Sequence, residues 1–211
     1  MYKTVEERIE KEGLLPVVVI ENPADGIPLA ETLKKANIHA IEITLRTKGA
    51  LEAIKAIADH CSDILVGAGT VLNIKQAKEA IACGAKFIVS PGFDTSLVNW
   101  CIENDVAVFP GCVTPGELMM AYNMGLRIVK FFPANLYGGI KGLTTLATVF
   151  TDMRFMPTGG ITIENIKDYI EKDFVSAVGG SWICKKEDIN GHRWERIEIL
   201  AREAKNVLKY S

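Results

Sequence analysis

The chain has 211 residues, of which 48% are hydrophobic and 24% charged, and its formal net charge is −2. This mixture is that of an ordinary folded protein and excludes an intrinsically disordered chain. The near-neutral charge gives no general basic surface for nucleic acid. No segment approaches the roughly 18 continuous apolar residues of a membrane span, and the polar start MYKTVEERIEKEG is unlike a signal peptide. We therefore expect a cytoplasmic protein that binds neither nucleic acid nor membrane.

Eight short apolar runs recur along the chain and predict strands. Their starts are 20 to 26 residues apart, at 16–20, 40–44, 64–69, 87–91, 107–111, 128–133, 154–158 and 176–180. Helical patterns lie between and after them, at 28–37, 50–60, 73–82, 94–104, 115–124, 140–149, 163–171 and 192–208. Expected helix caps are Asn73, Thr114 and Thr162, and the spacing of Thr4 and Glu7 predicts a short helix before the first strand.

Alternating strands and helices, with strands that are almost entirely apolar, favour an α/β fold with a parallel sheet covered by helices. Eight such units predict a single compact (β/α)₈ TIM barrel over residues 1–211. The alternative is an open, doubly wound sheet. No G-x-G-x-x-G motif follows the first strand, where Glu21-Asn22-Pro23 stands instead, so the dinucleotide-binding form of that alternative is not indicated.

The second predicted strand carries an acid among apolar residues. Successive side chains of a strand alternate between the barrel interior and the helix layer. Ile41 and Ile43 suit the helix layer, so Glu42, Thr44 and Arg46 are expected to face inward. A buried carboxylate is costly unless it is paired or functional. A structural ion pair is the alternative to a catalytic acid or base.

The sixth predicted strand carries a lysine in the same way. Ile128, Lys130 and Phe132 share one side of the strand. Burial disfavours the charged form of an amine, and a neutral amine condenses with a carbonyl to give a Schiff base. A lysine and Glu42 inside one barrel provide a carbonyl-trapping amine and a group that moves protons. If the two formed only an ion pair, the lysine would stay protonated and inert.

Glycine-rich turns follow the last two strands, at Thr158-Gly159-Gly160 and Gly180-Ser181. Loops at these positions often build the phosphate site of this barrel class. Glycines let backbone N–H groups approach an anion closely, and a following helix adds a favourable dipole. Ordinary turn geometry is the alternative.

Two further strand ends are small and polar. Thr70 follows the third strand and has a hydroxyl that suits a substrate carboxylate, and Pro91 follows the fourth strand and suits a pocket wall. Turn geometry is again the alternative for both.

The histidines and cysteines indicate no metal site. His39 and His60 are expected at the end of the barrel opposite the strand ends, and His192 lies near the start of the last helix. The five cysteines include no CxxC pair, so neither a disulfide framework nor a zinc ribbon is predicted. Cys112 follows the fifth strand and is the one cysteine that is expected to border the site, although a packing role is favoured.

Six motifs in order resemble the KDPG aldolase family, the 2-dehydro-3-deoxy-6-phosphogluconate and 4-hydroxy-2-oxoglutarate aldolases. They are EITLRT (42–47), GAGTVLN (67–73), SPG (90–92), KFFPA (130–134), PTGGI (157–161) and GGSW (179–182). The resemblance spans residues 16 to about 208. It implies a class I, pyruvate-dependent aldolase that works without metal or other cofactor as a homotrimer of barrels.

The resemblance also implies roles for individual residues. Lys130 is similar to the Schiff-base lysine and Glu42 to the general acid/base, while Arg46 and Thr70 resemble the groups that hold the pyruvyl carboxylate. The remaining substrate-binding positions are the pocket walls Pro91 and Phe132, and Thr158, Gly159, Gly160, Gly180 and Ser181 near the phosphate.

The implied reaction is cleavage of 2-dehydro-3-deoxy-6-phosphogluconate to pyruvate and glyceraldehyde 3-phosphate. The nearest alternatives are 4-hydroxy-2-oxoglutarate, which yields pyruvate and glyoxylate, and a galactonate-series phospho acid. Two departures from the family pattern concern the aldehyde half: Glu21 stands where relatives often carry Lys or Arg, and Asn135-Leu136 where they often carry Glu-Ala. Other phosphate-binding barrels, such as an epimerase or decarboxylase, and a non-enzymatic binding protein are the more distant alternatives.

Overall fold

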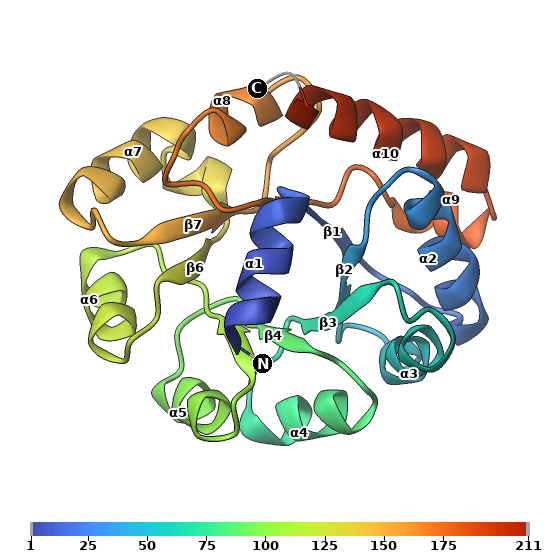
Figure 1. The fold of residues 1–211 in the computed structure, drawn as a ribbon, viewed down its shortest axis with the longest axis horizontal. Helices are drawn as coiled ribbons and strands as arrows, with labels where there is room; N and C mark the ends of the chain where they lie inside the picture. The colour runs from blue at the N-terminus through green and yellow to red at the C-terminus, as the bar shows by residue number, and fades with distance from the viewer. Residues whose placement is uncertain (1, 210–211) are drawn as a thin grey trace.

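The structure, a computed structural model, describes residues 2–209 and the side chains of residues 3–208. Within that range eight strands alternate with helices around a central barrel (Figure 1). The strands are β1 Leu14–Val18, β2 Ala40–Thr44, β3 Leu65–Gly69, β4 Phe87–Val89, β5 Ala107–Phe109, β6 Ile128–Phe131, β7 Arg154–Pro157 and β8 Val178–Gly180.

The helices form the outer layer of the molecule, apart from the first (Figure 1). The α-helices are α1 Tyr2–Glu12, α2 Gly26–Lys35, α3 Ala50–His60, α4 Ile74–Ala82, α5 Thr95–Glu103, α6 Pro115–Asn123, α7 Gly139–Val149, α8 Ile166–Ile170, α9 Lys186–Asn190 and α10 Trp194–Lys209. Two short 3₁₀ helices, η1 Pro23–Asp25 and η2 Ala134–Tyr137, precede α2 and α7.

All strand pairs are parallel and the sheet closes on itself. Hydrogen-bonded neighbours run in the order β5-β4-β3-β2-β1-β8, and β6 pairs with β7. Single bridges join the two parts, from Gly111 to Lys130 and from Thr158 to Gly179. The closed barrel is confirmed, and the open sheet is wrong because these two bridges join β6 and β7 to both edges of the six-stranded sheet.

The core has two layers that follow the predicted alternation of side chains. Ile41, Ile43 and Val129 pack outward in the large cluster between sheet and helices. Ala40 and Ile128 belong to a second cluster inside the barrel. The inward direction predicted for the second and sixth strands is therefore confirmed.

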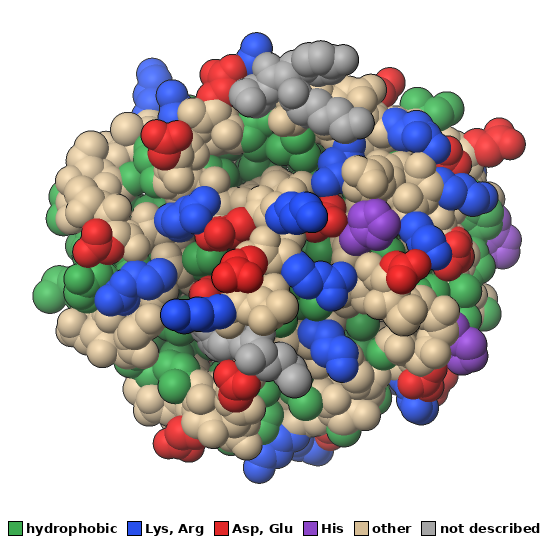
Figure 2. Space-filling model, in the orientation of Figure 1, with side chains coloured by type: hydrophobic (Ala, Val, Ile, Leu, Met, Phe, Trp, Pro, Cys, Tyr) green, Lys and Arg blue, Asp and Glu red, His purple; other side chains and the backbone are tan. Residues whose placement is uncertain are grey.

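Helix α1 closes the end of the barrel where the strands begin. Its residues Val5 and Ile9 are buried in the interior cluster, and the helix lies across the barrel end in Figure 1. The predicted helix before the first strand is confirmed, but α1 begins before Thr4, so Thr4 lies inside the helix and is not its cap. Figure 2 shows this end, with acidic and basic side chains intermixed over and around the helix.

Several boundaries differ from the sequence prediction. Strand β1 begins at Leu14 because Leu14 pairs with Val178, and the sheet accepts Pro16 opposite Gly180. The expected helix at 163–171 is only α8, which begins at Ile166, so Thr162 is not a helix cap. Helix α9, which follows β8, was not expected. The predicted caps Asn73 and Thr114 are confirmed. Among residues 2–209, no helix is both long and apolar enough to cross a membrane.

Candidate active site

A lysine and a glutamate meet inside the barrel near the ends of their strands. Lys130 on β6 and Glu42 on β2 lie with Nζ and Oε1 3.3 Å apart. Only 7% of the lysine side chain and 1% of the glutamate side chain are exposed. The sequence places these residues 88 positions apart, and the barrel brings them together as predicted. The pair is thus an amine beside a carboxylate in the buried interior of the barrel.

Two glycines of β3 make room for side chains inside the barrel, Gly69 for Glu42 and Gly67 for Phe87. A Cβ atom on Gly69 would lie 2.0 Å from Glu42 Oε1, and one on Gly67 would lie 2.3 Å from the ring of Phe87. In the register Gly69 sits opposite Thr44, and Gly67 sits opposite Glu42 on the neighbouring strand. The glycines in the GAGT motif therefore create space inside the barrel, which sequence analysis had not assigned to them.

Aromatic and proline residues border the lysine. The ring centroid of Phe132 is 5.2 Å from Lys130 Nζ, a cation–π distance. Pro91 lies in the loop after β4, and its carbonyl oxygen is so close to Gly111 that a Cβ there would come within 2.2 Å. Gly111 in turn bridges to Lys130. Phe132 therefore lies near the lysine, whereas Pro91 is linked to it only through the backbone of Gly111.

Arg46 and Thr70 come together just beyond the ends of β2 and β3. Arg46 Nε donates to Thr70 Oγ1 at 3.3 Å. Thr70 has φ 55°, in the left-handed region that β-branched residues rarely adopt. An arginine and a hydroxyl side by side form a donor pair for a carboxylate, in the place where sequence analysis expected one.

The turn after β7 holds its carbonyl groups in hydrogen bonds. Gly159 and Gly160 have φ 95° and 71°, which glycine adopts at little cost. Gly159 O accepts from Asn135 N at 3.2 Å, and Gly160 O accepts from Asn165 Nδ2 at 3.0 Å. The carbonyl oxygens of this turn are thereby occupied by the η2 segment and by the residue preceding α8.

The N–H groups of the same turn have no such partners. Within residues 2–209, the backbone N–H groups of Gly159, Gly160 and Ile161 donate no hydrogen bond. Successive free N–H groups form a concave donor array that suits an anion. The expected helix dipole does not contribute, because α8 begins at Ile166 and has only five residues.

The end of β8 lies beside this turn. Thr158 bridges to Gly179, and a Cβ on Gly179 would lie 2.1 Å from Thr158 Oγ1. The ring of Trp182 covers Gly180, and a Cβ atom on Gly180 would lie 2.5 Å from that ring. Ser181 is exposed, and its hydroxyl has no partner among residues 2–209. The two predicted glycine-rich turns are therefore neighbours.

Glu21 is neutralised by partners that sequence analysis had missed. Lys186 Nζ lies 2.8 Å from Glu21 Oε1, and Asn190 Nδ2 donates to Glu21 Oε2 at 2.6 Å. The hydrogen bond from Lys186, supported by that from Asn190, holds the pKa of Glu21 below its usual range. The sequence does show two adjacent lysines after β8, Lys185 and Lys186. It does not indicate with which acidic residue they form an ion pair.

The Cys112 side chain does not border the site, although its backbone N–H donates to Lys130 O at 2.8 Å. Its side chain is buried in the outer cluster, and its Sγ contacts Glu117 O at 3.9 Å. Burial raises the pKa of the Cys112 thiol far above its ordinary value, which makes it unreactive. Among residues 2–209, no three histidine, cysteine or acidic side chains gather as metal ligands.

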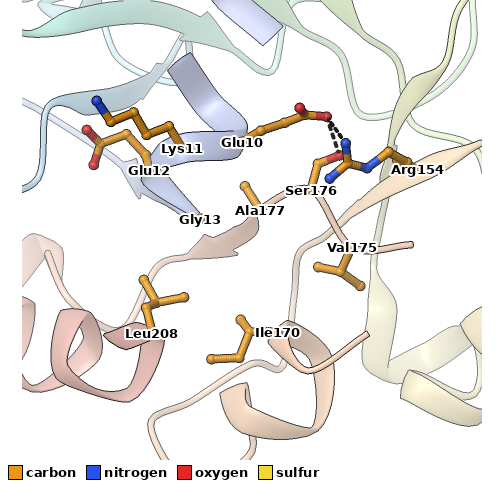
Figure 3. A pocket seen from close by; sticks show the side chains of 10 residues that line it. All are labelled: Glu10, Lys11, Glu12, Gly13, Arg154, Ile170, Val175, Ser176, Ala177 and Leu208. Carbon is orange, nitrogen blue, oxygen red and sulfur yellow. Dashed lines mark hydrogen bonds and ion pairs between the residues drawn. The ribbon is translucent and has the colours of Figure 1, made fainter. Parts of the chain in front are cut away.

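A separate cavity of about 240 Å³ lies at the opposite end of the barrel (Figure 3). Arg154 at the start of β7 points across it to Glu10 of α1, with Nη1 2.6 Å from Oε1. Ser176 Oγ donates to the same carboxylate oxygen at 3.3 Å. This cavity lies at the strand starts and shares no residue with the lysine site.

The protein is a closed α/β barrel with a buried lysine–glutamate pair and free N–H groups at its strand ends. This arrangement suits an enzyme whose lysine amine attacks the carbonyl group of an anionic substrate. The family model described as KDPG and KHG aldolase matches residues 5–200. The chain therefore belongs to the KDPG and KHG aldolase family and is an aldolase.

Named relatives and solved structures agree. The 2-dehydro-3-deoxy-phosphogluconate aldolase of Treponema pallidum is 40% identical over 97% of this chain and 98% of its own. The KHG/KDPG aldolase of Escherichia coli K12 is 40% identical over 96% of each chain. The KDPG aldolase of Legionella pneumophila, solved with pyruvate captured as a covalent carbinolamine, is 37% identical with a TM-score of 0.91 over 94% of this chain and 97% of that one.

Proposed function

We propose that this protein is a class I aldolase that cleaves 2-dehydro-3-deoxy-6-phosphogluconate into pyruvate and glyceraldehyde 3-phosphate. The observation that carries the proposal is the contact of Lys130 Nζ with Glu42 Oε1 at 3.3 Å inside the barrel. The carbinolamine of pyruvate in the Legionella pneumophila relative supports an amine nucleophile in this family.

Catalysis begins at the C2 ketone of the substrate. The neutral amine of Lys130 attacks C2 and forms a carbinolamine, whose hydroxyl leaves as water after Glu42 supplies a proton. The product is a protonated imine between Lys130 and C2. Glu42 is the one carboxylate that contacts this amine among residues 2–209, which suits it to move protons at this carbon.

Cleavage of the C3–C4 bond follows from the imine. Glu42, now ionised, takes the proton of the C4 hydroxyl, and the C4–O bond becomes the aldehyde carbonyl. The C3–C4 electron pair moves into the imine and gives an enamine. After the aldehyde leaves, protonated Glu42 gives a proton to C3, and water hydrolyses the resulting imine to release pyruvate and restore the Lys130 amine.

The substrate lies across the strand ends with an anion at each end. Arg46 and Thr70 hold the pyruvyl carboxylate, and Phe132 and Pro91 wall the reacting carbons. The phosphate lies against the turns after β7 and β8, where the Gly159 and Gly160 N–H groups, the Ser181 hydroxyl and the neighbouring Thr158 and Gly180 surround it. The free donors of the first turn support this orientation.

A second candidate substrate is 4-hydroxy-2-oxoglutarate, which the same steps would split into pyruvate and glyoxylate. The Escherichia coli relative named for both activities favours it. A galactonate-series phospho acid differs at C4, and nothing in the site favours it. Measuring pyruvate release from all three substrates decides between them. The proposal predicts the highest kcat/KM for 2-dehydro-3-deoxy-6-phosphogluconate, and a higher value for either competitor contradicts it.

The same proposal includes the physical state of the protein. Residues 1–211 form one folding unit, and three copies assemble into a homotrimer in the cytoplasm. Light scattering during size-exclusion chromatography should give three times the chain mass, and urea unfolding should give a single transition. A monomer at micromolar concentration contradicts the trimer without affecting the chemistry.

A further inference from the structure

Asn135 lies on the glycine turn after β7. A Cβ on Gly160 would come within 2.4 Å of Asn135 Cβ and 2.8 Å of its Nδ2. The backbone of Asn135 is fixed at the same place, because its N–H donates to Gly159 O at 3.2 Å. The Asn135 side chain thus fills the space that the Cβ of any other residue at position 160 would occupy. This close approach therefore requires glycine at position 160.

The carboxamide of Asn135 is a free hydrogen-bonding group. Asn135 is exposed, and neither of its side-chain polar atoms has a hydrogen-bond partner among residues 2–209. Nδ2 is the polar atom of this side chain that is nearest to the Gly160 Cβ position, so the amide lies against the turn. Asn135 therefore adds a side-chain N–H₂ group to a turn that already offers unpartnered backbone N–H groups.

The surroundings of this amide favour donation to an anion. The turn's own carbonyl oxygens at Gly159 and Gly160 already accept hydrogen bonds, so they offer little competition for the Asn135 donor. The groups left free in the turn are donors, and Ser181 at the neighbouring strand end adds a hydroxyl. Free donors on neighbouring segments suit a phosphoryl group.

We propose that Asn135 is a specificity-determining residue that donates a side-chain hydrogen bond to the phosphoryl group of the aldehyde half of the substrate. The inference rests on the proposed function and adds a residue on the η2 segment to the anion-binding turns. The neutral amide is essential to this role. A carboxylate at this position would repel a phosphate dianion, and an alanine would only remove one donor.

The experiment compares Asn135→Asp, Asn135→Ala and the control Leu136→Asp. Leu136 is the next residue and is 76% exposed, and the atoms nearest to the Gly160 Cβ position belong to Asn135. Leu136→Asp therefore introduces the same negative charge close by without the contact to Gly160. Steady-state kinetics are measured with 2-dehydro-3-deoxy-6-phosphogluconate and with 4-hydroxy-2-oxoglutarate. The inhibition constant of inorganic phosphate is measured against 4-hydroxy-2-oxoglutarate cleavage.

A hydrogen bond to a charged group is expected to be worth about a tenfold factor or more. Asn135→Asp should therefore lower the ratio of kcat/KM for the phosphorylated over the unphosphorylated substrate at least about tenfold, through KM. It should raise the phosphate inhibition constant by a similar factor. Asn135→Ala should give a smaller change in the same direction, and Leu136→Asp should change the ratio less than about twofold.

Two outcomes overturn the inference. One is an unchanged ratio in Asn135→Asp, which includes an equal loss on both substrates, and the other is an equal change of the ratio in Leu136→Asp. Failure of the proposed function is distinct, because it is read from the wild-type protein, which would then prefer a competing substrate or release pyruvate from neither. In both cases the comparison of the variants with the wild type is separate. If neither substrate is cleaved, phosphate binding is measured directly by calorimetry, and unchanged affinity in Asn135→Asp still overturns the role of the amide.

Discussion

The two ends of the barrel each carry an acid paired with a base, and they use the pair differently. At the strand starts, Arg154 and Glu10 are 2.6 Å apart with side chains 43% and 26% exposed, and they join β7 to α1. At the strand ends, Lys130 and Glu42 are 3.3 Å apart and almost wholly buried. The exposed pair is an ordinary tether, whereas the buried pair would be a costly way to gain stability alone.

The two ends of the barrel also differ in the basic residue of the pair, which is arginine at the strand starts and lysine at the strand ends. A guanidinium does not serve as a nucleophile in proteins, whereas a lysine amine can attack a carbonyl carbon and form a Schiff base. The space around each pair also differs. Val5 and Ile9 of α1 fill the barrel at its starting end, while Gly67 and Gly69 of β3 are closely approached by Phe87 and Glu42. A buried lysine beside a buried carboxylate is therefore the feature that sets the strand ends apart.

The largest effect is expected from removing the amine. Lys130→Ala should lower kcat/KM at least about 10⁴-fold, because the covalent intermediate can no longer form. Lys130→Arg should be equally inactive, since it keeps the charge without the nucleophile. Pyruvate release measured with lactate dehydrogenase and NADH reports the rate. An active Lys130→Arg enzyme would show that charge and not nucleophilicity matters.

The next effect is expected from removing the proton-transfer group. Glu42→Gln should lower kcat about 10²–10⁴-fold, the usual contribution of a general acid/base. The amine remains in this variant, so slow formation of a pyruvate adduct should persist. Steady-state kinetics and stopped-flow measurement of adduct formation separate the two steps. Full turnover in Glu42→Gln would remove Glu42 from the mechanism.

A smaller effect is expected from filling the space beside Glu42. In Gly69→Ala the new methyl would lie 2.0 Å from Glu42 Oε1, so the carboxylate must move. A displacement of this size should lower kcat about 10–100-fold. Gly116→Ala is the control, because nothing lies within 4 Å of the new atom. Equal kinetics in the two variants would contradict the role assigned to Gly69.

The smallest effect is expected at the opposite end. Glu10→Gln breaks the ion pair with Arg154, so the free energy of unfolding should fall by about 1 kcal/mol or less, as for other partly exposed pairs. Urea unfolding measures this change. The value of kcat/KM should stay within about twofold of wild type. A loss of activity comparable to that of Glu42→Gln would erase the distinction between the two ends.

Much of this arrangement could be predicted from local patterns. Alternation along two strands directs Glu42 and Lys130 inward, and eight strand–helix units give the barrel that brings them together. Turn composition also indicates the glycine turns after β7 and β8. These features depend on the alternation of side chains along a strand and on the order of the elements along the chain. Both can be read from the sequence.

The remainder depends on contacts between distant segments. The role of Gly69 follows from its register beside β2, and the salt bridge of Glu21 with Lys186 follows from the meeting of the β1–α2 loop with α9. Asn135 acquires its position from the packing of η2 on Gly160. The late start of α8 at Ile166 was also unpredicted, because Thr162 imitates a helix cap but its N–H bonds to Asn165 instead.

The most direct test is chemical trapping of the proposed imine. The protein is incubated with pyruvate and sodium borohydride, digested, and analysed by mass spectrometry, with Lys130→Ala and Glu10→Gln treated in parallel. Hydride reduces an imine to a stable secondary amine, so we predict a reduced pyruvyl adduct on the peptide that contains Lys130, present in Glu10→Gln and absent from Lys130→Ala. An adduct on another lysine, or none while Lys130→Ala still releases pyruvate, would contradict a Lys130 Schiff base.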